Sequence, residues 1–479
     1  MDTREQTVTG GRLVTRELAE WVAGLRYEDI PADAVEEAGR ALSDFFCETL
    51  YVGACQPWGR SIAEFAAIEG GPGDATIIAS GGRTSASKAA FANGTMALGF
   101  ELADFGAGSR YYPFTVTGPL AVAESRHRSG RDFVTAVVLG YELMARILKA
   151  TKNVVPGQRG TGPAPAPGAF YVPAVYGTVA SAAGSARVLG LDPQHTNYAI
   201  GLGTAFAGGT FQGHEEGAWQ RSLNGGMASE RGVTAALLGQ QGFKATEMGL
   251  EGVQGFAVQY SGGHLDPDAL FDGLGDSWVI TERWSKSYPL NVTLHAPVEA
   301  LNQIMQENNL THTDIAEIDA AWQRVEEFLA KSEVTTVVGA QASLYYALAV
   351  TAVRGHKPTV DDVSEENVAD PVVQAMIDRI SVHADEELFS QVRNSMPGAV
   401  TVRTTDGREF HAEVRYPRGN AANRLPEDEF FGKYLHMTER VIGRDQATEL
   451  YERARNVQDI EDIAELGPLM SPKATEGAK

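Results

Sequence analysis

The densest run of small residues, between residues 176 and 217, constrains the fold more than any other feature of the sequence. Its two main stretches read GTVASAAGSARVLGL and GLGTAFAGGT, and alanine, glycine, serine and threonine make up most of both. The run is too apolar for a linker, and such small side chains let neighbouring helices approach closely. The sequence therefore predicts an interior layer of packed helices.

Helical patterns surround this run from about residue 15 to residue 275. Val35, Ala38 and Leu42 recur at helical spacing after Pro31, which stands at a position that favours a helix start. Similar patterns occupy residues 85–103 and 130–148. These features predict a large helical domain over residues 1–275.

The pattern changes after residue 275, where helical and strand-like segments alternate. An apolar helix is expected to end at Gly355, and alternating residues on both sides of Asp406-Gly407 predict a β-hairpin. Short β-favouring runs occupy residues 278–281, 316–325, 334–338, 400–404 and 409–416. We therefore expect a smaller α+β domain over residues 276–418, inserted into the helical one. Residues 419–479 are charged and helical, and are expected to return to the first domain.

Composition excludes several classes of protein. The formal net charge of -22 repels phosphate backbones, so we expect no nucleic-acid partner. No apolar run reaches the roughly 20 residues of a membrane span, and the N-terminus lacks the apolar segment of a secretory signal. Cys47 and Cys55 lack a zinc-binding spacing and are interpreted as buried thiols. These features predict a cytoplasmic protein without a membrane segment.

One segment, residues 155–173, interrupts the helical pattern. It reads VPGQRGTGPAPAPGAFYVP, and its proline and glycine content opposes regular structure. Long loops in compact domains are commonly functional, so we expect this loop to contribute to a site, although a tolerated surface insertion is the alternative. The glycines of GLGTAFAGG follow no strand and lack a GK[ST] pattern, which argues against a nucleotide site.

Several segments in a fixed order resemble the MmgE/PrpD family, which includes 2-methylcitrate dehydratase and cis-aconitate decarboxylase. They cover nearly the whole chain, and none is decisive alone. The matching segments are SASKAAFANGTMALGFELAD (85–104), GPLAVAES (118–125), GRDFVTAVVLGYEL (130–143), YGTVASAAGSARVLGLD (176–192), LNGGMASERGVTAALLGQQGF (223–243), KSYPLNVTLHAPVEA (286–300), AQASLYYALAVTAVRG (340–355) and YPRGNAANRL (416–425).

This resemblance implies a mainly α fold, in which a large helical domain carries a smaller inserted α+β lid and the site lies between them. It also implies a homodimer and a small-molecule substrate with a carboxylate or activated carbonyl. Family enzymes remove a proton beside a carboxylate and expel or replace a neighbouring group, without a metal or another cofactor. Such chemistry needs a base, an acid and cations that hold carboxylates.

At the family's acid–base positions this sequence departs from the usual pattern. The Asp-rich turn reads GFELAD, so Glu101 and Asp104 are its remaining carboxylates, on one face if the helix continues. Tyr112 stands in the His-Pro step, with Arg110 or Tyr111 as alternatives because the spacing requires a gap. Tyr171 stands at the second histidine position. Both tyrosines could instead be aromatic anchors, and the acid pair could be solvated.

The expected binding residues surround one retained lysine. Lys286 keeps the family's form, and Arg221 replaces the other lysine with a group that stays charged and cannot act as a base. His214 is expected to have a raised pKa if Glu215 and Glu216 lie close. The other residues expected to contribute to binding are Tyr288, His295, Gln341 and Arg110; His295 could instead be a core histidine.

These replacements change the chemistry that the site can perform. Phenols titrate near ~10 rather than ~6.5, so Tyr112 or Tyr171 would act as acids unless cations lower their pKa. We therefore expect a lyase, dehydratase or isomerase with an unusual, less charged or bulkier substrate. The alternatives are conventional 2-methylcitrate or cis-aconitate chemistry that uses His214 and His295, and a binding protein without catalysis.

Overall fold

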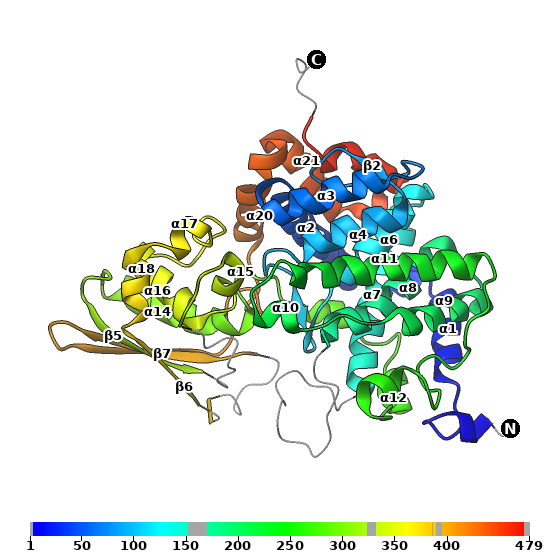
Figure 1. Cartoon of the computed structure of the whole chain (residues 1–479), viewed down its shortest axis with the longest axis horizontal. Helices are drawn as coiled ribbons and strands as arrows, with labels where there is room; N and C mark the ends of the chain where they lie inside the picture. The colour runs from blue at the N-terminus through cyan, green and yellow to red at the C-terminus, as the bar shows by residue number, and fades with distance from the viewer. Residues whose placement is uncertain (1–2, 152–169, 323–331, 386, 389–394, 474–479) are drawn as a thin grey trace.

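Two long helices form the centre of the helical part. The computed structural model describes residues 3–151, 170–322, 332–385, 387–388 and 395–473. Every residue of α8 (Val172–Leu189) except Arg187 is buried, and α11 (Gln220–Gln240) packs along it. Helices α4 (Ala86–Ala97) and α9 (Pro193–Phe206) pack against α11 as well (Figure 1). The predicted interior layer of helices built from small residues is confirmed.

Glycines explain how closely these helices approach. A Cβ atom on Gly225 of α11 would lie 2.3 Å from the carbonyl oxygen of Gly94 in α4. A Cβ on Gly226 would lie 2.3 Å from the Phe91 carbonyl, and one on Gly232 would lie 2.4 Å from the side chain of Ser181 in α8. At all three positions a larger residue would push the helices apart.

We expect Gly225→Ala to lower the free energy of unfolding by about 1–3 kcal/mol, because the added methyl group must displace backbone atoms of α4. Urea unfolding measures the change. The matched control is Gly432→Ala in α20 (Glu427–Ile442), where the new Cβ meets nothing within 4 Å. The control is expected to gain up to ~1 kcal/mol from helix propensity. Equal effects at both positions would contradict the proposed close contact.

The other helices surround this centre or connect it to the sheet. Side-chain caps start α4, α7 and α9: Ser85 accepts from Lys88 N, Ser129 from Asp132 N, and Asp192 from His195 N. The α-helices of the helical part not yet given are α1 (Val14–Gly24), α2 (Ala32–Cys55), α3 (Pro57–Glu69), α5 (Tyr112–Thr115), α6 (Thr117–Ser125), α7 (Gly130–Ala150), α10 (Gln212–Glu215), α12 (Phe256–Ser261), α13 (Pro267–Phe271) and α21 (Arg444–Arg455). The 3-10 helices are η1 (Thr3–Gln6), η2 (Tyr27–Asp29), η3 (Val279–Glu282), η4 (Val292–Leu294), η5 (Val457–Asp459) and η6 (Ile463–Met470).

A four-stranded sheet lies at one end of the molecule (Figure 1). Its order is β6-β5-β7-β8, with β5 parallel to β6 and antiparallel to β7. The predicted hairpin is confirmed as β7 and β8, joined through Gly407 at φ 88°. The strands are β5 (Ile315–Trp322), β6 (Ile380–Ala384), β7 (Gly398–Thr404) and β8 (Glu409–Val414).

Helices cover one face of this sheet. Helix α14 (His295–Glu307) packs on β7 and β8, and α16 (Leu344–Arg354) packs on α14 and β6. The expected end of the second helix at Gly355 is confirmed, since this glycine caps it in the left-handed conformation. Short helices α15 (Val337–Ala340), α17 (Glu365–Val368) and α18 (Pro371–Ile377) complete this part.

Two predicted strands are wrong. Residues 278–281 enter the 3-10 helix η3, because the backbone N–H of Val279 is bound by the Glu142 carboxylate of α7 rather than by a strand. Residues 334–338 run into α15, whose first turn is capped by the Thr336 hydroxyl. In both places a side chain satisfies the backbone groups that a sheet would otherwise pair.

The helices near the C-terminus contact a helix from the first part of the chain. Helices α20 and α21 pack against α2, far from the sheet (Figure 1). Most of the predicted loop 155–173 lies outside the described residues, and its last two residues already belong to α8. No helix in the described part of the chain is long and apolar enough to cross a membrane.

Candidate active site

A sharp turn after α4 places the first candidate residue. Helix α4 ends at Ala97, and Glu101 adopts a positive φ of 57° that no helix can contain. The expected helix over residues 85–103 is therefore too long, and Glu101 and Asp104 do not share a helix face. The Glu101 carbonyl instead accepts a hydrogen bond from Lys286 Nζ at 2.7 Å.

Three cations converge on the Glu101 carboxylate, and we call these four residues the Glu101 cluster. Arg221 Nη1 lies 2.7 Å from Oε1, while Arg110 Nη2 and Lys286 Nζ lie 2.8 and 3.0 Å from Oε2. Arg110 belongs to the short hairpin of β3 (Phe105–Gly106) and β4 (Ser109–Arg110), and Arg221 to the first turn of α11. The tertiary structure thus brings together four of the residues expected from the sequence.

The electrostatics of the Glu101 cluster favour a further negative charge. Burial opposes ionisation of Glu101, but Arg110, Lys286 and Arg221 hold its pKa well below the usual value. Burial lowers the pKa of Lys286 to about 8, although the Glu101 charge works in the opposite direction. With one carboxylate among three cations, the cluster carries an excess of positive charge at neutral pH.

An aromatic stack borders the Glu101 cluster. The His214 ring stacks against both Tyr171 and Phe211, at centroid distances of 4.4 and 4.7 Å, and the centroids of those two rings lie 6.3 Å apart. Burial raises the pKa of Tyr171, and the charge of Arg110 offsets only part of that rise. The cations therefore do not turn this phenol into a base, and it stays protonated at neutral pH.

The His214 pKa is not raised, as it was expected to be if Glu215 and Glu216 lay close, but lowered. Burial and the charges of Arg221 and Arg110 hold it well below the usual value, whereas Glu101 works weakly in the other direction. Neither Glu215 nor Glu216 is among the main causes of this shift in the His214 pKa. His214 is therefore a neutral imidazole at the edge of the Glu101 cluster.

Several buried polar atoms near this cluster have no hydrogen-bond partner among the described residues. They include Arg110 Nε, Arg221 Nε, His214 Nδ1 and both side-chain ends of Gln341. Gln341 is fully buried and follows α15, where Gly339 and Thr336 lie against Gly217 of the His214 loop. Because buried polar groups are normally satisfied, such a concentration of free donors and acceptors is typical of a ligand site.

Two other expected binding residues have protein partners. The Tyr288 hydroxyl donates a hydrogen bond to Glu299 of α14 at 2.7 Å, so it already has a partner within the protein. His295 is buried beside the Tyr288 ring, and burial together with the Lys286 charge lowers its pKa to about 3. His295 is therefore neutral at neutral pH, and it lies near enough to Lys286 for that charge to lower its pKa.

Tyr112 and Asp104 form hydrogen bonds to groups outside the Glu101 cluster. The buried Tyr112 hydroxyl donates to Glu48 Oε2 of α2 at 2.5 Å, and its pKa is raised well above 10 by burial and by that carboxylate. Asp104 accepts from Tyr141 at 2.5 Å and from the backbone N–H groups of Tyr111 and Tyr112. Both residues support the turn that carries Arg110.

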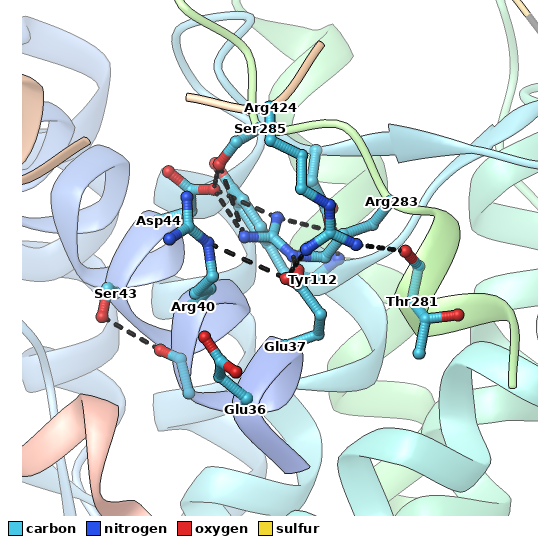
Figure 2. A network of polar contacts seen from close by, with 12 residues as sticks. Glu36, Glu37, Arg40, Ser43, Asp44, Tyr112, Thr281, Arg283, Ser285 and Arg424 are labelled. Atoms are coloured by element: carbon cyan, nitrogen blue, oxygen red, sulfur yellow. Dashed lines mark hydrogen bonds and ion pairs between the residues drawn. The ribbon is translucent and has the colours of Figure 1, made fainter. Parts of the chain in front are cut away.

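A buried network of charges, which we call the Arg283 network, fixes the segment before Lys286 (Figure 2). Arg283 donates to Glu37 at 3.1 Å and to Asp44 at 3.0 Å, both on α2, and lies 3.5 Å from Asp104. Arg424 also binds Glu37. Ser285 and Lys433 complete the contacts of Asp44, and Lys433 donates to the Lys286 carbonyl at 3.1 Å.

Glu48 and the Arg283 network were not predicted from the sequence. A signal for the carboxylates was present: Asp44 and Glu48 stand four residues apart in the otherwise apolar text SDFFCETLYV, so they share a helix face that must be buried. Arg283 carried no comparable signal, because its partners come from distant segments. Among the described residues, no group of three or more His, Cys, Asp or Glu side chains could hold a metal ion.

Comparison with known proteins agrees with this architecture. The model of the MmgE/PrpD N-terminal domain matches residues 16–267, and that of the MmgE/PrpD C-terminal domain matches residues 288–459. The chain is 25% identical to the cis-aconitate decarboxylase-like protein oryM of Aspergillus oryzae, over 96% of this chain and 97% of that protein. It is 24% identical to a cis-aconitate decarboxylase of Aspergillus terreus, over 96% of each chain, and 22% identical to the human cis-aconitate decarboxylase, over 73% of this chain and 71% of that one. The chain belongs to the MmgE/PrpD family.

Proposed function

We propose that this chain is a lyase that acts on a small carboxylate substrate by proton transfer at the carbon beside the carboxylate. The relatives named above support the reaction class. The observation that carries the proposal is the Glu101 cluster, with its excess of positive charge and its neighbouring buried polar atoms without partners. An anionic ligand would satisfy both features.

The proposed roles follow from charge and protonation. Arg110 and Arg221 each keep an unpaired Nε and would bind a substrate carboxylate. Lys286 would stabilise the negative charge that is left on the carbon beside the remaining carboxylate when carbon dioxide leaves. Tyr171, protonated and beside Arg110, would donate a proton, and the neutral His214 would orient the substrate. Tyr112 and Asp104 would support these groups from behind.

A test uses cis-aconitate and 2-methylcitrate as probes, and follows the release of carbon dioxide or water. We expect activity to fall as pH rises through about 8, because Lys286 then loses its proton. Removing the Tyr171 hydroxyl in Tyr171→Phe is expected to lower kcat by a factor of roughly 100 to 10,000, the usual range for a lost general acid. Dialysis against EDTA is expected to leave the rate unchanged.

Tyr176→Phe is the matched control, since this buried hydroxyl bonds Thr151 away from the Glu101 cluster. Full activity in Tyr171→Phe would remove that tyrosine from the chemistry. Thermal stabilisation by both acids without turnover of either would favour a binding protein over an enzyme.

A further inference from the structure

Glu48 is a buried carboxyl group that the proposed roles do not use. It lies in the middle of α2 with no exposed surface, and among the described residues it has no ion-pair partner within 4.0 Å. The nearby cations Arg283 and Lys433 are bound to Asp44, one helical turn before it. A buried carboxyl group without a counterion is costly, so its hydrogen bonds must compensate.

Those hydrogen bonds span the Glu101 turn. Glu48 Oε1 accepts from the backbone N–H of Phe100 at 2.6 Å and from that of Leu102 at 3.4 Å, one on each side of Glu101. Oε2 accepts from the Tyr112 hydroxyl at 2.5 Å. The residue between the two bound N–H groups is the one with the unfavourable positive φ. Such a conformation persists only where the surroundings hold it.

We propose that Glu48 is a positioning residue, which holds the Glu101 turn and the Tyr112 hydroxyl and thereby sets the geometry of the Glu101 cluster. Without its carboxylate, Phe100 and Leu102 would lose the acceptor inside the fold, and the turn could relax toward an ordinary φ. Glu101 would then move relative to Arg110, Arg221 and Lys286. The effect on catalysis rests on the proposed function; the effect on the turn does not.

A pH dependence follows from this geometry. Burial raises the pKa of Glu48 to about 7, although Tyr112, the Phe100 N–H and the charge of Lys286 work in the opposite direction. The charge of Glu48 also contributes to raising the pKa of the Cys47 thiol on the same helix, after burial as the main cause. Near neutral pH, Glu48 therefore exchanges between a carboxylate, which accepts all three bonds, and an acid, which accepts them less well. Its charge also helps to keep Lys286 protonated.

The test compares Glu48→Ala and Glu48→Gln with Glu251→Gln. Glu251 is an equally buried carboxyl group that binds the backbone and hydroxyl of Thr15, near the N-terminus. Hydrogen exchange of a peptide covering residues 98–104 reports on the turn, and turnover of cis-aconitate from pH 6 to pH 9 reports on the site. In Glu48→Ala we expect exchange at least ~10-fold faster in that peptide and a kcat lower by a factor on the order of 100, with a smaller change in KM.

In the wild-type chain we expect turnover to rise with pH through about 7, as Glu48 ionises and accepts its three hydrogen bonds. In Glu48→Gln, which keeps one acceptor oxygen, the turn is expected to stay protected and this rise is expected to be absent. Glu251→Gln is expected to change neither measurement. Wild-type exchange of residues 98–104 in a folded Glu48→Ala protein would overturn the proposal. So would a wild-type pH profile in Glu48→Gln. If the wild-type chain does not convert cis-aconitate, the proposed function is in error for that substrate, and the exchange experiment alone decides the role of Glu48.

Discussion

The Lys286→Met variant is expected to lose a factor of roughly 100 to 1,000 in kcat/KM on cis-aconitate, because it removes the cation proposed to stabilise the developing negative charge. Lys286 is 1% exposed and donates to both the carbonyl and the carboxylate of Glu101. The nearby Lys433 is bound to Asp44 and is therefore not expected to take its place. Steady-state kinetics between pH 6 and pH 9 measure the loss.

Two further variants make this prediction specific. Lys286→Arg keeps a charge that does not titrate in this range, so the fall in activity near pH 8 should disappear even if the rate is reduced. Lys149→Met removes an exposed lysine at the end of α7 and should leave the kinetics unchanged. A Lys286→Met enzyme with kinetics like those of the Lys149→Met control would exclude Lys286 from the chemistry.

The largest effect on stability is expected at Arg283. Replacing it with methionine leaves Glu37, Asp44 and Asp104 without their shared buried cation. Burial opposes ionisation of Asp44, and Arg283 together with Lys433 keeps its pKa below the usual value, so the charged form depends on these cations. Removing one partner of a buried ion pair costs about 3–5 kcal/mol, and we expect Arg283→Met to lower the free energy of unfolding by that amount.

Urea unfolding at pH 7 provides the measurement, and Arg408→Met provides the control, because Arg408 pairs with Asp406 on the surface. The double variant Arg283→Met with Asp44→Asn should be less unstable than the sum of the two single variants, since one unpaired charge is removed. A loss below about 1 kcal/mol in Arg283→Met would show that the Arg283 network does not stabilise the fold.

Local patterns in the sequence predicted the mainly helical fold and several of its individual elements. The small-residue run, the helices at 130–148 and 341–353, and the hairpin at Asp406-Gly407 depend on periodicity, caps and turn residues that act within a few positions. The order of the matching segments predicted the family. The domain limits after residues 275 and 418, the homodimer and the cytoplasmic location remain predictions.

Several of the errors occurred where distant side chains compete with local preference. The strand expected at 278–281 became a 3-10 helix when Glu142 bound its backbone, and the helix expected to continue through 103 ended where Glu48 bound Phe100 and Leu102. Similarly, His214 was expected to have a raised pKa from its sequence neighbours. Burial and two arginines from other segments lowered the pKa instead.

The sequence by itself determined several of the helices, the faces of small residues through which they pack, and the family. It also supplied the candidate site residues, which include Glu101, Arg110, Arg221 and Lys286. Only the tertiary structure decided that these four meet, that Tyr112 lies behind them on Glu48, and that Arg283 holds the segment before Lys286. The physical reason is the separation along the chain over which each interaction acts. Helix propensity and turns act between neighbours in the chain, whereas charge and burial depend on groups that come together only when the chain folds.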